Sequence, residues 1–271
     1  VMERSQLIDV LKQLKAAPPV VALVAPAIVG QFGSSLGQVI AGLKELGFHA
    51  VAEVAAGADE VAAHEADEFV ERMEKGQKFM TSSCCPAYTE SVKKHVPEVE
   101  EFVSSTRTPM HVTAAQLEKD FSKATKVFIG PCVAKRKEAL DDEFVDLVLT
   151  FEEVAALFEA KGIECKGLEE AAPLNSAKRE GRSFPTTGGV TAAIKAFVGE
   201  RCELKPISID GLEKKSIKLL SAFAKGRCSG NFVEVMGCRG GCAAGPGVVE
   251  DVKKATRAIN SFAKSSESSS S

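Results

Sequence analysis

The sequence predicts an α/β fold built as two lobes of small, mainly parallel sheets flanked by helices. Short apolar runs such as 20–24 and 127–129 alternate along the chain with longer stretches whose apolar residues recur at helical spacing. Runs that are apolar throughout are typical of parallel strands buried on both faces. With 271 residues, 45% of them apolar, the chain is long enough for one large domain or two lobes.

The first part of the chain alternates in this way. Apolar residues at helical spacing predict an amphipathic helix over 3–16, and the run at 20–24 predicts the first strand. Gly47 is placed to end a helix over 34–46. A strand over 48–54, an acidic helix over 59–75, and helices over 88–95 and 111–123 follow.

The second part continues the alternation. We expect strands over 127–129, 145–149, 207–209 and 232–236, and helices over 151–160, 188–198, 214–224 and 252–262. The stretch 164–187 is irregular and is not assigned. The serine-rich segment 265–271 predicts a disordered tail. The predicted organisation is therefore one folded unit over 1–264, with its lobes divided near residue 125, and a tail.

Composition excludes two classes of partner. The net charge of −3 is nearly neutral and no basic run is interleaved with aromatic residues, so no nucleic-acid partner is expected. The longest apolar stretch, 20–29, is interrupted by Pro26 and is too short to cross a bilayer. No signal peptide precedes it, which predicts a soluble, cytoplasmic protein without a membrane partner. The opening Val1-Met2 is unlike a native start and is consistent with a processed or excised piece.

Three separated cysteine signatures carry the chemistry. They are TSSCCP at 81–86, GPCVAK at 130–135 and MGCRGGC at 236–242, and they contain five of the eight cysteines. Each follows an apolar segment and lies in a loop rich in small residues. Such loops bring backbone N–H groups close to the sulfurs of a bulky iron–sulfur cluster. In the cytosol disulfides are rare, so grouped cysteines indicate a metal site or catalysis.

Four thiolates are needed to hold a [4Fe–4S] cluster. Cys238 and Cys242 have C-x3-C spacing, Cys132 stands alone, and one backbone can hardly aim both Cys84 and Cys85 at one cluster. We expect one member of that pair to complete the ligand set and to leave the other thiol free beside the cluster. The alternatives are a structural zinc site, a vicinal disulfide and inert buried cysteines, the last being the role expected for Cys165, Cys202 and Cys228.

The three signatures, in this order, resemble the H-cluster motifs of the [FeFe]-hydrogenase catalytic domain. Residues 21–33 resemble the first strand and loop of that domain, and 184–190 (FPTTGGV) resemble its Thr-Gly-Gly segment. The resemblance extends over roughly residues 20–260. It implies a cluster buried between the two lobes, and reversible oxidation of H2 or reduction of protons as the reaction.

The resemblance also implies roles for the cysteines. Cys85, Cys132, Cys238 and Cys242 would bind the [4Fe–4S] part of the H-cluster. Cys242 would also bridge to a diiron subsite that carries CO, cyanide and a dithiolate amine (azadithiolate). Cys84 would pass protons to that amine.

Lys135 would hold a cyanide ligand through a charge-assisted hydrogen bond. The alternative is an ordinary surface lysine in the basic run 135–137, but its fixed offset from Cys132 favours the functional role. The residues that would line the diiron pocket are Ala25, Pro26, Thr108, Pro131, Phe184 and Met236.

A buried site that reduces protons needs a relay of titratable groups. Glu65 and Glu68 are three residues apart on one predicted helix and therefore share a face. With Ser104 they match the proton route of the family, in the order Glu68, Ser104, Glu65, Cys84 from the surface inward. The alternative is a merely solvated acidic face, as Glu60, Glu71 and Glu74 on the same helix indicate.

Three positions depart from the family pattern. Gly130, Ala27 and Met110 stand where members commonly carry methionine, serine and glutamine near the diiron site. Gly130 and Ala27 favour a hydrogen sensor with slow turnover, whereas Cys84 with Glu65, Glu68 and Ser104 favours an enzyme. A third possibility is a non-catalytic relative of the iron–sulfur assembly type. The presence of Cys84 next to Cys85 and of the proton-route residues argues against it.

The expected partners follow from the resemblance. The chain has no ferredoxin-type C-x2-C-x2-C-x3-C-P run, so electrons would come from a ferredoxin-like carrier or from a cluster-bearing domain outside this chain. Hydrogenase maturation proteins would supply the diiron subsite, and H2 and protons would be the substrates. A chain made without maturation would hold the [4Fe–4S] part alone or be empty.

Overall fold

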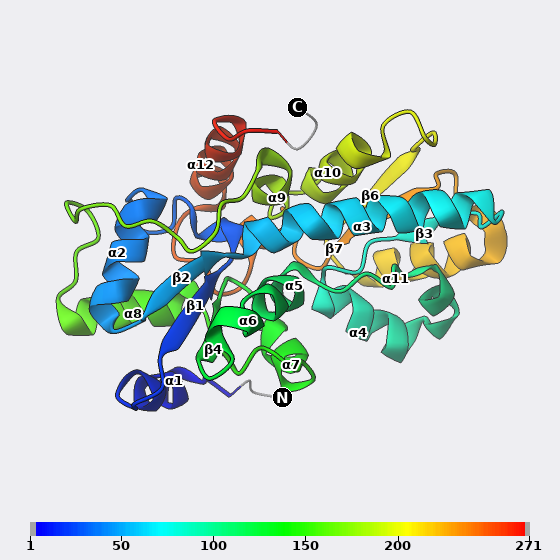
Figure 1. The fold of residues 1–271 in the computed structure, drawn as a ribbon. Coiled ribbons are helices and arrows are strands. Elements are labelled where there is room, and N and C mark those ends of the chain that lie inside the picture. The colour runs from blue at the N-terminus through cyan, green and yellow to red at the C-terminus, as the bar shows by residue number, and fades with distance from the viewer. Residues whose placement is uncertain (1–3, 269–271) are drawn as a thin grey trace.

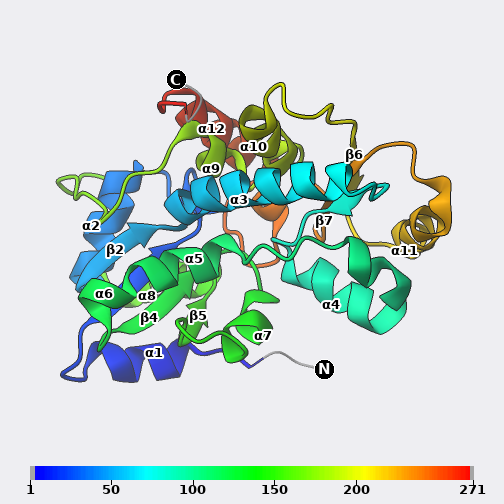
Figure 2. The ribbon, with the colours of Figure 1, turned by 45° about the vertical axis from the view of Figure 1, so that its right-hand side comes forward.

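Two parallel sheets form the centre of the structure, a computed structural model that describes residues 4–268 (Figures 1 and 2). The first sheet has the order β2-β1-β4-β5 and contains β1 (Val20–Val24), β2 (Ala50–Glu53), β4 (Thr125–Ile129) and β5 (Leu147–Leu149). The second has the order β3-β7-β6 and contains β3 (Met80–Thr81), β6 (Pro206–Asp210) and β7 (Phe232–Met236). All five strand pairings are parallel. The predicted α/β class with parallel sheets flanked by helices is confirmed.

The two sheets are interleaved along the chain. Strand β4 begins at Thr125 and pairs with β1 in the first sheet, whereas β3, earlier in the chain, pairs with β7 in the second. The predicted divide near residue 125 therefore does not separate the sheets. The physical reason is that parallel strands need long connections, and here the segment from β2 to β4, which lie on opposite sides of β1, includes a strand of the other sheet.

Helices cover both sheets (Figure 1). Up to residue 140 they are α1 (Leu7–Leu14), α2 (Leu36–Leu46), α3 (Val54–Glu74), α4 (Pro86–His95), α5 (Pro109–Gln116), α6 (Glu118–Phe121) and α7 (Lys135–Leu140). The later ones are α8 (Phe151–Lys161), α9 (Arg179–Ser183), α10 (Gly189–Val198), α11 (Lys214–Ala222) and α12 (Val252–Lys264). None of the helices within residues 4–268 is long and apolar enough to cross a membrane.

Local signals explain where α2 and α8 begin and end. Ser35 and Thr150 form capping boxes with the residues three positions on, and satisfy backbone N–H groups of the first turn. Gly47 and Gly162 take the left-handed conformation just after the last turn, which ends both helices where the sequence predicts. The short α7 and α9 lack such signals and were not predicted.

Helix α3 crosses the molecule from the first sheet to the second in both views (Figures 1 and 2). Its 21 residues correspond to about 31 Å. It begins directly after β2, five residues before the predicted start, because its first two turns are buried against α5 and α9. A Cβ at Gly57 would lie 2.7 Å from the carbonyl oxygen of Pro109, and one at Gly181 would lie 1.9 Å from that of Ala55. Glycine is therefore required at both contacts.

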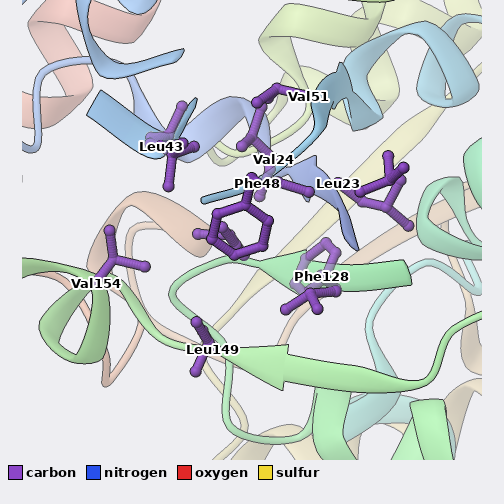
Figure 3. Close-up of a cluster of buried hydrophobic side chains, with 14 of the residues drawn as sticks. Leu23, Val24, Leu43, Phe48, Val51, Phe128, Leu149 and Val154 are labelled. Carbon is purple, nitrogen blue, oxygen red and sulfur yellow. The ribbon is translucent and has the colours of Figure 1, made fainter. Parts of the chain in front are cut away.

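The largest apolar core surrounds the first sheet. Figure 3 shows Leu23, Val51, Phe128 and Leu149, which come from its four strands, packed with side chains of the covering helices. The second lobe has two smaller cores. One lies between α3, α10 and β7, where the rings of Phe69 and Phe232 meet edge to face. The other lies beneath α4 and α11.

The segment that follows α12 packs against α9. Residues 265–268, which the sequence assigns to a disordered tail, follow α12 and bond to α9: the backbone N–H of Arg179 donates to the carbonyl of Glu267 at 2.8 Å. The Ser268 hydroxyl donates to Glu180 at 2.7 Å. The rest of the predicted tail, 269–271, lies outside the described residues.

One buried acid ties β7 to α10. Glu234 is fully buried, and its two carboxylate oxygens accept hydrogen bonds from the N–H groups of Gly188 and Thr191 and from the Thr191 hydroxyl at 2.6–2.8 Å. These donors belong to the Thr-Gly-Gly segment and to the first turn of α10, so the carboxylate also faces the positive end of that helix. The loop before α10 is thereby held against the strand that leads to Cys238.

We expect Glu234→Gln to lower the free energy of unfolding by about 3 kcal/mol. The amide NH2 of glutamine would face N–H donors and leave at least one of them unsatisfied. Chemical denaturation measures the change. Glu203→Gln, which removes an exposed ion pair with Lys205, is the control and should change stability by no more than about 0.5 kcal/mol. Equal stabilities of the two variants would show that the hydrogen bonds accepted by Glu234 do not stabilise the contact between β7 and α10.

Candidate metal centre

Four strands of the two sheets end at one cavity. The residues that follow β1 and β4 reach it from the first sheet, and those that follow β3 and β7 reach it from the second. Loops at the carboxyl ends of parallel strands are where α/β folds place ligands. The three cysteine signatures follow β3, β4 and β7, so the topology brings them together although about 160 residues separate Cys84 from Cys242.

Five cysteines line this cavity: Cys84, Cys85, Cys132, Cys238 and Cys242. The rest of the wall is almost entirely apolar, and the predicted Ala25, Pro26, Pro131, Phe184 and Met236 all belong to it. The apolar wall also includes Ala27, Val54, Ala58, Met110, Phe128 and Pro185. A thiol-rich cavity with so few other polar groups suits a ligand that bonds to sulfur and needs little water around it.

The thiols lie close enough to influence one another. Burial, opposed by the charge of Lys135 and reinforced by the nearby Cys85, raises the pKa of Cys132 to about 11. Burial, and then neighbouring cysteines, also raise the pKa of Cys238 and of Cys242. Thiolates in such a place need a compensating positive charge, which iron ions of a cluster supply. The donor set of Cys85, Cys132, Cys238 and Cys242 thus fits a [4Fe–4S] cluster.

Glycines allow the cysteine loops to meet. A Cβ at Gly237 would lie 3.1 Å from the Cys85 sulfur, and one at Gly241 would lie 2.5 Å from the carbonyl oxygen of Pro185. Gly241 also has a φ of +74°, which other residues rarely adopt. Within residues 4–268 no three His, Cys, Asp or Glu side chains are grouped closely enough to share a single metal ion. A structural zinc ion requires such a group.

Cys84 lines the cavity beside Cys85 and lies near enough to Glu65, one of the predicted acids on α3, to be influenced by its charge. Burial raises its pKa well above the ordinary value, and the negative charge of Glu65 raises it further. The thiol is therefore held in its neutral, proton-bearing form between the cavity and Glu65. Of the two vicinal cysteines, Cys84 is the one whose pKa is raised by an acidic residue, Glu65.

Lys135 is a buried residue of the cavity wall and not a surface lysine. It begins α7, is 8% exposed, and donates to both oxygens of Glu138 at 2.9 and 2.7 Å. Burial alone would lower its pKa, but the Glu138 carboxylate outweighs that effect and raises it. Lys135 therefore places a positive charge at the wall of an otherwise apolar cavity.

Thr108 lies beside the cavity rather than on its wall. Its hydroxyl donates to Glu138, and both residues line a neighbouring polar pocket. Glu138 was not predicted as a site residue. Its offset of three residues from Lys135 brings the two side chains together only on a helix, and α7 has no signal in the sequence.

Glu65 is fully buried on α3. One carboxyl oxygen accepts the N–H of Ser83 at 3.2 Å, and the other has no hydrogen-bond partner among the described residues. Burial raises its pKa to about 8; the Ser104 hydroxyl lowers it and the Glu68 charge raises it. Glu65 therefore carries a proton at neutral pH.

Glu68, one turn further along α3, has the opposite environment. It accepts hydrogen bonds from the Ser104 hydroxyl at 2.6 Å and from backbone and hydroxyl groups of Ser105 and Thr106. Arg72 pairs with it at 2.6 Å. Burial raises its pKa, but the hydrogen bonds from residues 104–106 outweigh this and lower the pKa to about 2. These two glutamates point into the protein and are not part of a solvated acidic face.

The space next to Gly130 is already filled. A Cβ there would lie 2.5 Å from the Phe128 ring, which itself lines the cavity. A larger side chain at 130 therefore requires a smaller residue at 128. This coupling explains the glycine that departs from the family pattern, and it was not visible from the sequence.

Glu65 makes stability depend on pH. The unfolded chain releases the Glu65 proton near pH 4.5, whereas the folded chain keeps it up to about pH 8. Between these values the folded state binds more protons, so stability falls as pH rises, by roughly 1 kcal/mol per pH unit. We expect Glu65→Gln to remove this fall, measured by urea denaturation from pH 5 to 8. Glu71→Gln on the exposed face is the control and should keep the fall.

Comparison with known proteins gives the family. The model described as iron only hydrogenase large subunit, C-terminal domain, matches residues 18–246. Iron hydrogenase 1 of Clostridium pasteurianum is 28% identical over 279 residues, which cover 85% of this chain and 49% of the relative. Protein NAR1 of Arabidopsis thaliana is 24% identical, over 77% of this chain and 59% of the relative. The chain thus spans about half of the length of the clostridial relative.

Solved structures agree on the fold. HydA(deltaEFG), a structure reported for stepwise [FeFe]-hydrogenase H-cluster assembly, superposes with a TM-score of 0.81 at 22% identity and covers 98% of this chain and 91% of that chain. An apo variant of [FeFe]-hydrogenase HydA1 from Chlamydomonas reinhardtii gives a TM-score of 0.78 at 21% identity, over 94% and 88%. Because the family model matches most of the sequence, the chain belongs to the family defined by the C-terminal domain of the iron-only hydrogenase large subunit.

Proposed function

We propose that this domain is an [FeFe]-hydrogenase, which oxidises H2 and reduces protons reversibly at an H-cluster. The observation that carries the proposal is the content of one cavity: five cysteines from three loops, a buried lysine and an apolar wall. The membership of the family supports it. Iron hydrogenases among the relatives carry out this type of reaction according to their names.

The residues have distinct roles in this proposal. Cys85, Cys132, Cys238 and Cys242 would hold a [4Fe–4S] cluster, and Cys242 would share its sulfur with a diiron subsite carrying CO, cyanide and azadithiolate. The H-cluster would supply the electron-transfer and H2 chemistry. Lys135 would direct a charge-assisted hydrogen bond to cyanide. The apolar wall would exclude water and strengthen that bond.

The proton path would run from Glu68 through Ser104 and Glu65 to Cys84. Three features support this order. The Ser104 hydroxyl donates to Glu68, and Glu65 holds a proton at neutral pH while one of its oxygens lacks a partner among the described residues. Cys84 lies between Glu65 and the cavity and is kept protonated. A protonated Glu65 can donate to the Ser104 oxygen or pass its proton inward, which is the behaviour a relay requires.

A hydrogen sensor is the second candidate. Phe128 beside Gly130, together with Ala27 and Met110, leaves the wall near the diiron position with fewer polar groups than the family pattern. Such changes alter the potential and proton affinity of a bound group and favour slow turnover. A non-catalytic assembly role, suggested by the NAR1 relatives, is disfavoured because it leaves Cys84, Glu65 and Glu68 without a function.

The partners and the compartment follow from the same proposal. A ferredoxin-like carrier, or a cluster-bearing domain outside this chain, would exchange electrons, and hydrogenase maturation proteins would insert the diiron subsite. We place the protein in the cytoplasm, where eight free thiols persist. The names of its relatives include both a periplasmic hydrogenase and cytosolic assembly factors.

Infrared spectroscopy of the anaerobically matured protein tests the proposal. We expect sharp bands in the region of metal-bound CO and cyanide, and we expect them to shift under H2. The turnover rate then distinguishes an enzyme from a sensor. A blank region in a protein whose iron and sulfide stand in the ratio of a cubane would refute the H-cluster and favour the assembly role.

Cys84→Ala tests the proton path. We expect loss of at least about 100-fold in H2 production, because the last group before the cavity can no longer carry a proton. Iron content and the infrared bands should remain, since Cys84 is not among the proposed ligands. Cys228→Ala, at a partly buried position packed against the core beneath α4 and α11, is the matched control and should keep both activity and iron. Full activity in Cys84→Ala would remove this residue from the path.

A further inference from the structure

The strand beside β7 holds the third cysteine loop, residues 236–242. β6 pairs with β7, and Asp210, the last residue of β6, is in register with Met236. The pairing continues past the strand, because the N–H of Gly211 donates to the carbonyl of Met236 at 2.9 Å. The carboxyl end of β6 therefore lies against this loop, although the residues of β6 do not line the metal cavity.

The middle of the third cysteine loop consists of two glycines, Gly240 and Gly241, which have no side chains that could anchor it. Both have positive φ values, +92° and +74°. Glycine loses more backbone entropy on folding than other residues, so this conformation depends on the hydrogen bonds of the two N–H groups. The Gly241 N–H donates to the carbonyl of Cys238 at 3.1 Å, within the loop. The Gly240 N–H donates instead to the carboxylate of Asp210, at 2.7 Å.

One carboxylate oxygen of Asp210 connects two parts of the chain. Oδ1 accepts the N–H of Gly240 at 2.7 Å and the hydroxyl of Thr187 at 2.9 Å. Thr187 belongs to the Thr-Gly-Gly segment, in which the carbonyl of Pro185 accepts the N–H of Ala243 at 3.1 Å. The loop and this segment are thus joined on both sides of the last cysteine in the loop.

Asp210 lies on the side of the loop that faces solvent. It is exposed and lines a second pocket, of about 480 Å³, which shares no lining residue with the metal cavity. The lining of this pocket contains no lysine or arginine within the described part of the chain. The carboxylate is therefore oriented by its two hydrogen bonds and not by an ion pair. Glu213, three residues on, differs in this respect, because it pairs with Lys215 and Arg239.

We propose that Asp210, oriented by Thr187, is a positioning residue for the [4Fe–4S] cluster, because it fixes the path of the chain between Cys238 and Cys242. The inference rests on the proposed ligand roles of these two cysteines and does not need the diiron subsite. A carboxylate oxygen suits this task, since it accepts two donors at once and carries no hydrogen of its own. A loop that is held before the cluster binds has less conformational freedom to lose on binding.

Release of iron from protein reconstituted with the [4Fe–4S] cluster alone tests the proposal. We expect Asp210→Ala to release iron to excess EDTA about 10-fold faster than the unmodified protein, because partners that orient metal ligands typically contribute that much to metal affinity. Asp210→Asn should release iron at the unmodified rate, since its amide oxygen can accept both hydrogen bonds. Rescue by asparagine separates the role of the acceptor oxygen from that of the charge.

Glu213→Gln is the matched control. It removes a carboxylate that pairs with Arg239 of the same loop, but it leaves the hydrogen bond between Gly240 and Asp210 intact. Iron release from this variant should equal that of the unmodified protein. Release as fast as from Asp210→Ala would show that any lost charge near the loop has this effect, and would overturn the positioning role.

A second arm needs no iron. In the apo protein, NMR should show amide hydrogen exchange at Gly240 about 10-fold faster in Asp210→Ala than in the unmodified protein, and unchanged in Asp210→Asn. Thr187→Val removes the second donor to Asp210 and should give intermediate exchange and intermediate iron release. Unchanged exchange in Asp210→Ala would overturn the proposal. Should Asp210→Ala fail to fold, unmodified exchange and iron release in Thr187→Val would do the same.

The two proposals fail in different ways. If the unmodified protein binds no [4Fe–4S] cluster on reconstitution, the ligand roles of the cysteines are refuted, whatever the variants do. If it binds the cluster and Asp210→Ala retains iron equally well, only the role of Asp210 is refuted.

Discussion

The relation between the two sheets depends on one helix. α3 leaves the first sheet directly after β2, crosses the molecule and ends shortly before β3 of the second sheet. Its contacts with α5 and α9 are so close that Gly57 and Gly181 have no space for a Cβ atom. The same helix contributes Val54 and Ala58 to the cavity wall and places Glu65 behind Cys84. Because packing at such density resists adjustment, a shift of α3 would change the cavity and the acids together.

Two glutamates on α3, Glu65 and Glu68, have shifted pKa values of opposite sign because their surroundings differ. Glu65 has one backbone donor and an oxygen without a partner among the described residues, so burial dominates and the carboxyl keeps its proton. Glu68 accepts hydrogen bonds from residues 104–106 and pairs with Arg72, so it stays ionised although it is half-buried. At neutral pH the inner acid is therefore protonated and the outer one is ionised. Ser104, which donates to the outer acid, stands between them in the proposed path.

The parts of the structure that could be predicted are those with local signals. Apolar runs located β1 and β7, Gly47 marked a helix end, and the need of a cluster for four thiolates predicted one site for the three cysteine signatures. The interleaving of the sheets has no local signal, since it depends on which strands pair. The same holds for Phe128 beside Gly130 and for Glu138 bonded to Thr108, where the informative contact is between residues that the fold alone brings together.

The shortest strand has a consequence for the order of events in the cell. β3 is two residues long, and Met80 in it pairs with Phe232. During synthesis, the loop that carries Cys84 and Cys85 has no β7 to rest on until Phe232 has left the ribosome, and the last thiol follows at Cys242. A nascent chain therefore cannot present all four thiols around one cavity. A cluster that is bound through all three cysteine loops could therefore form only after residue 242 has been translated.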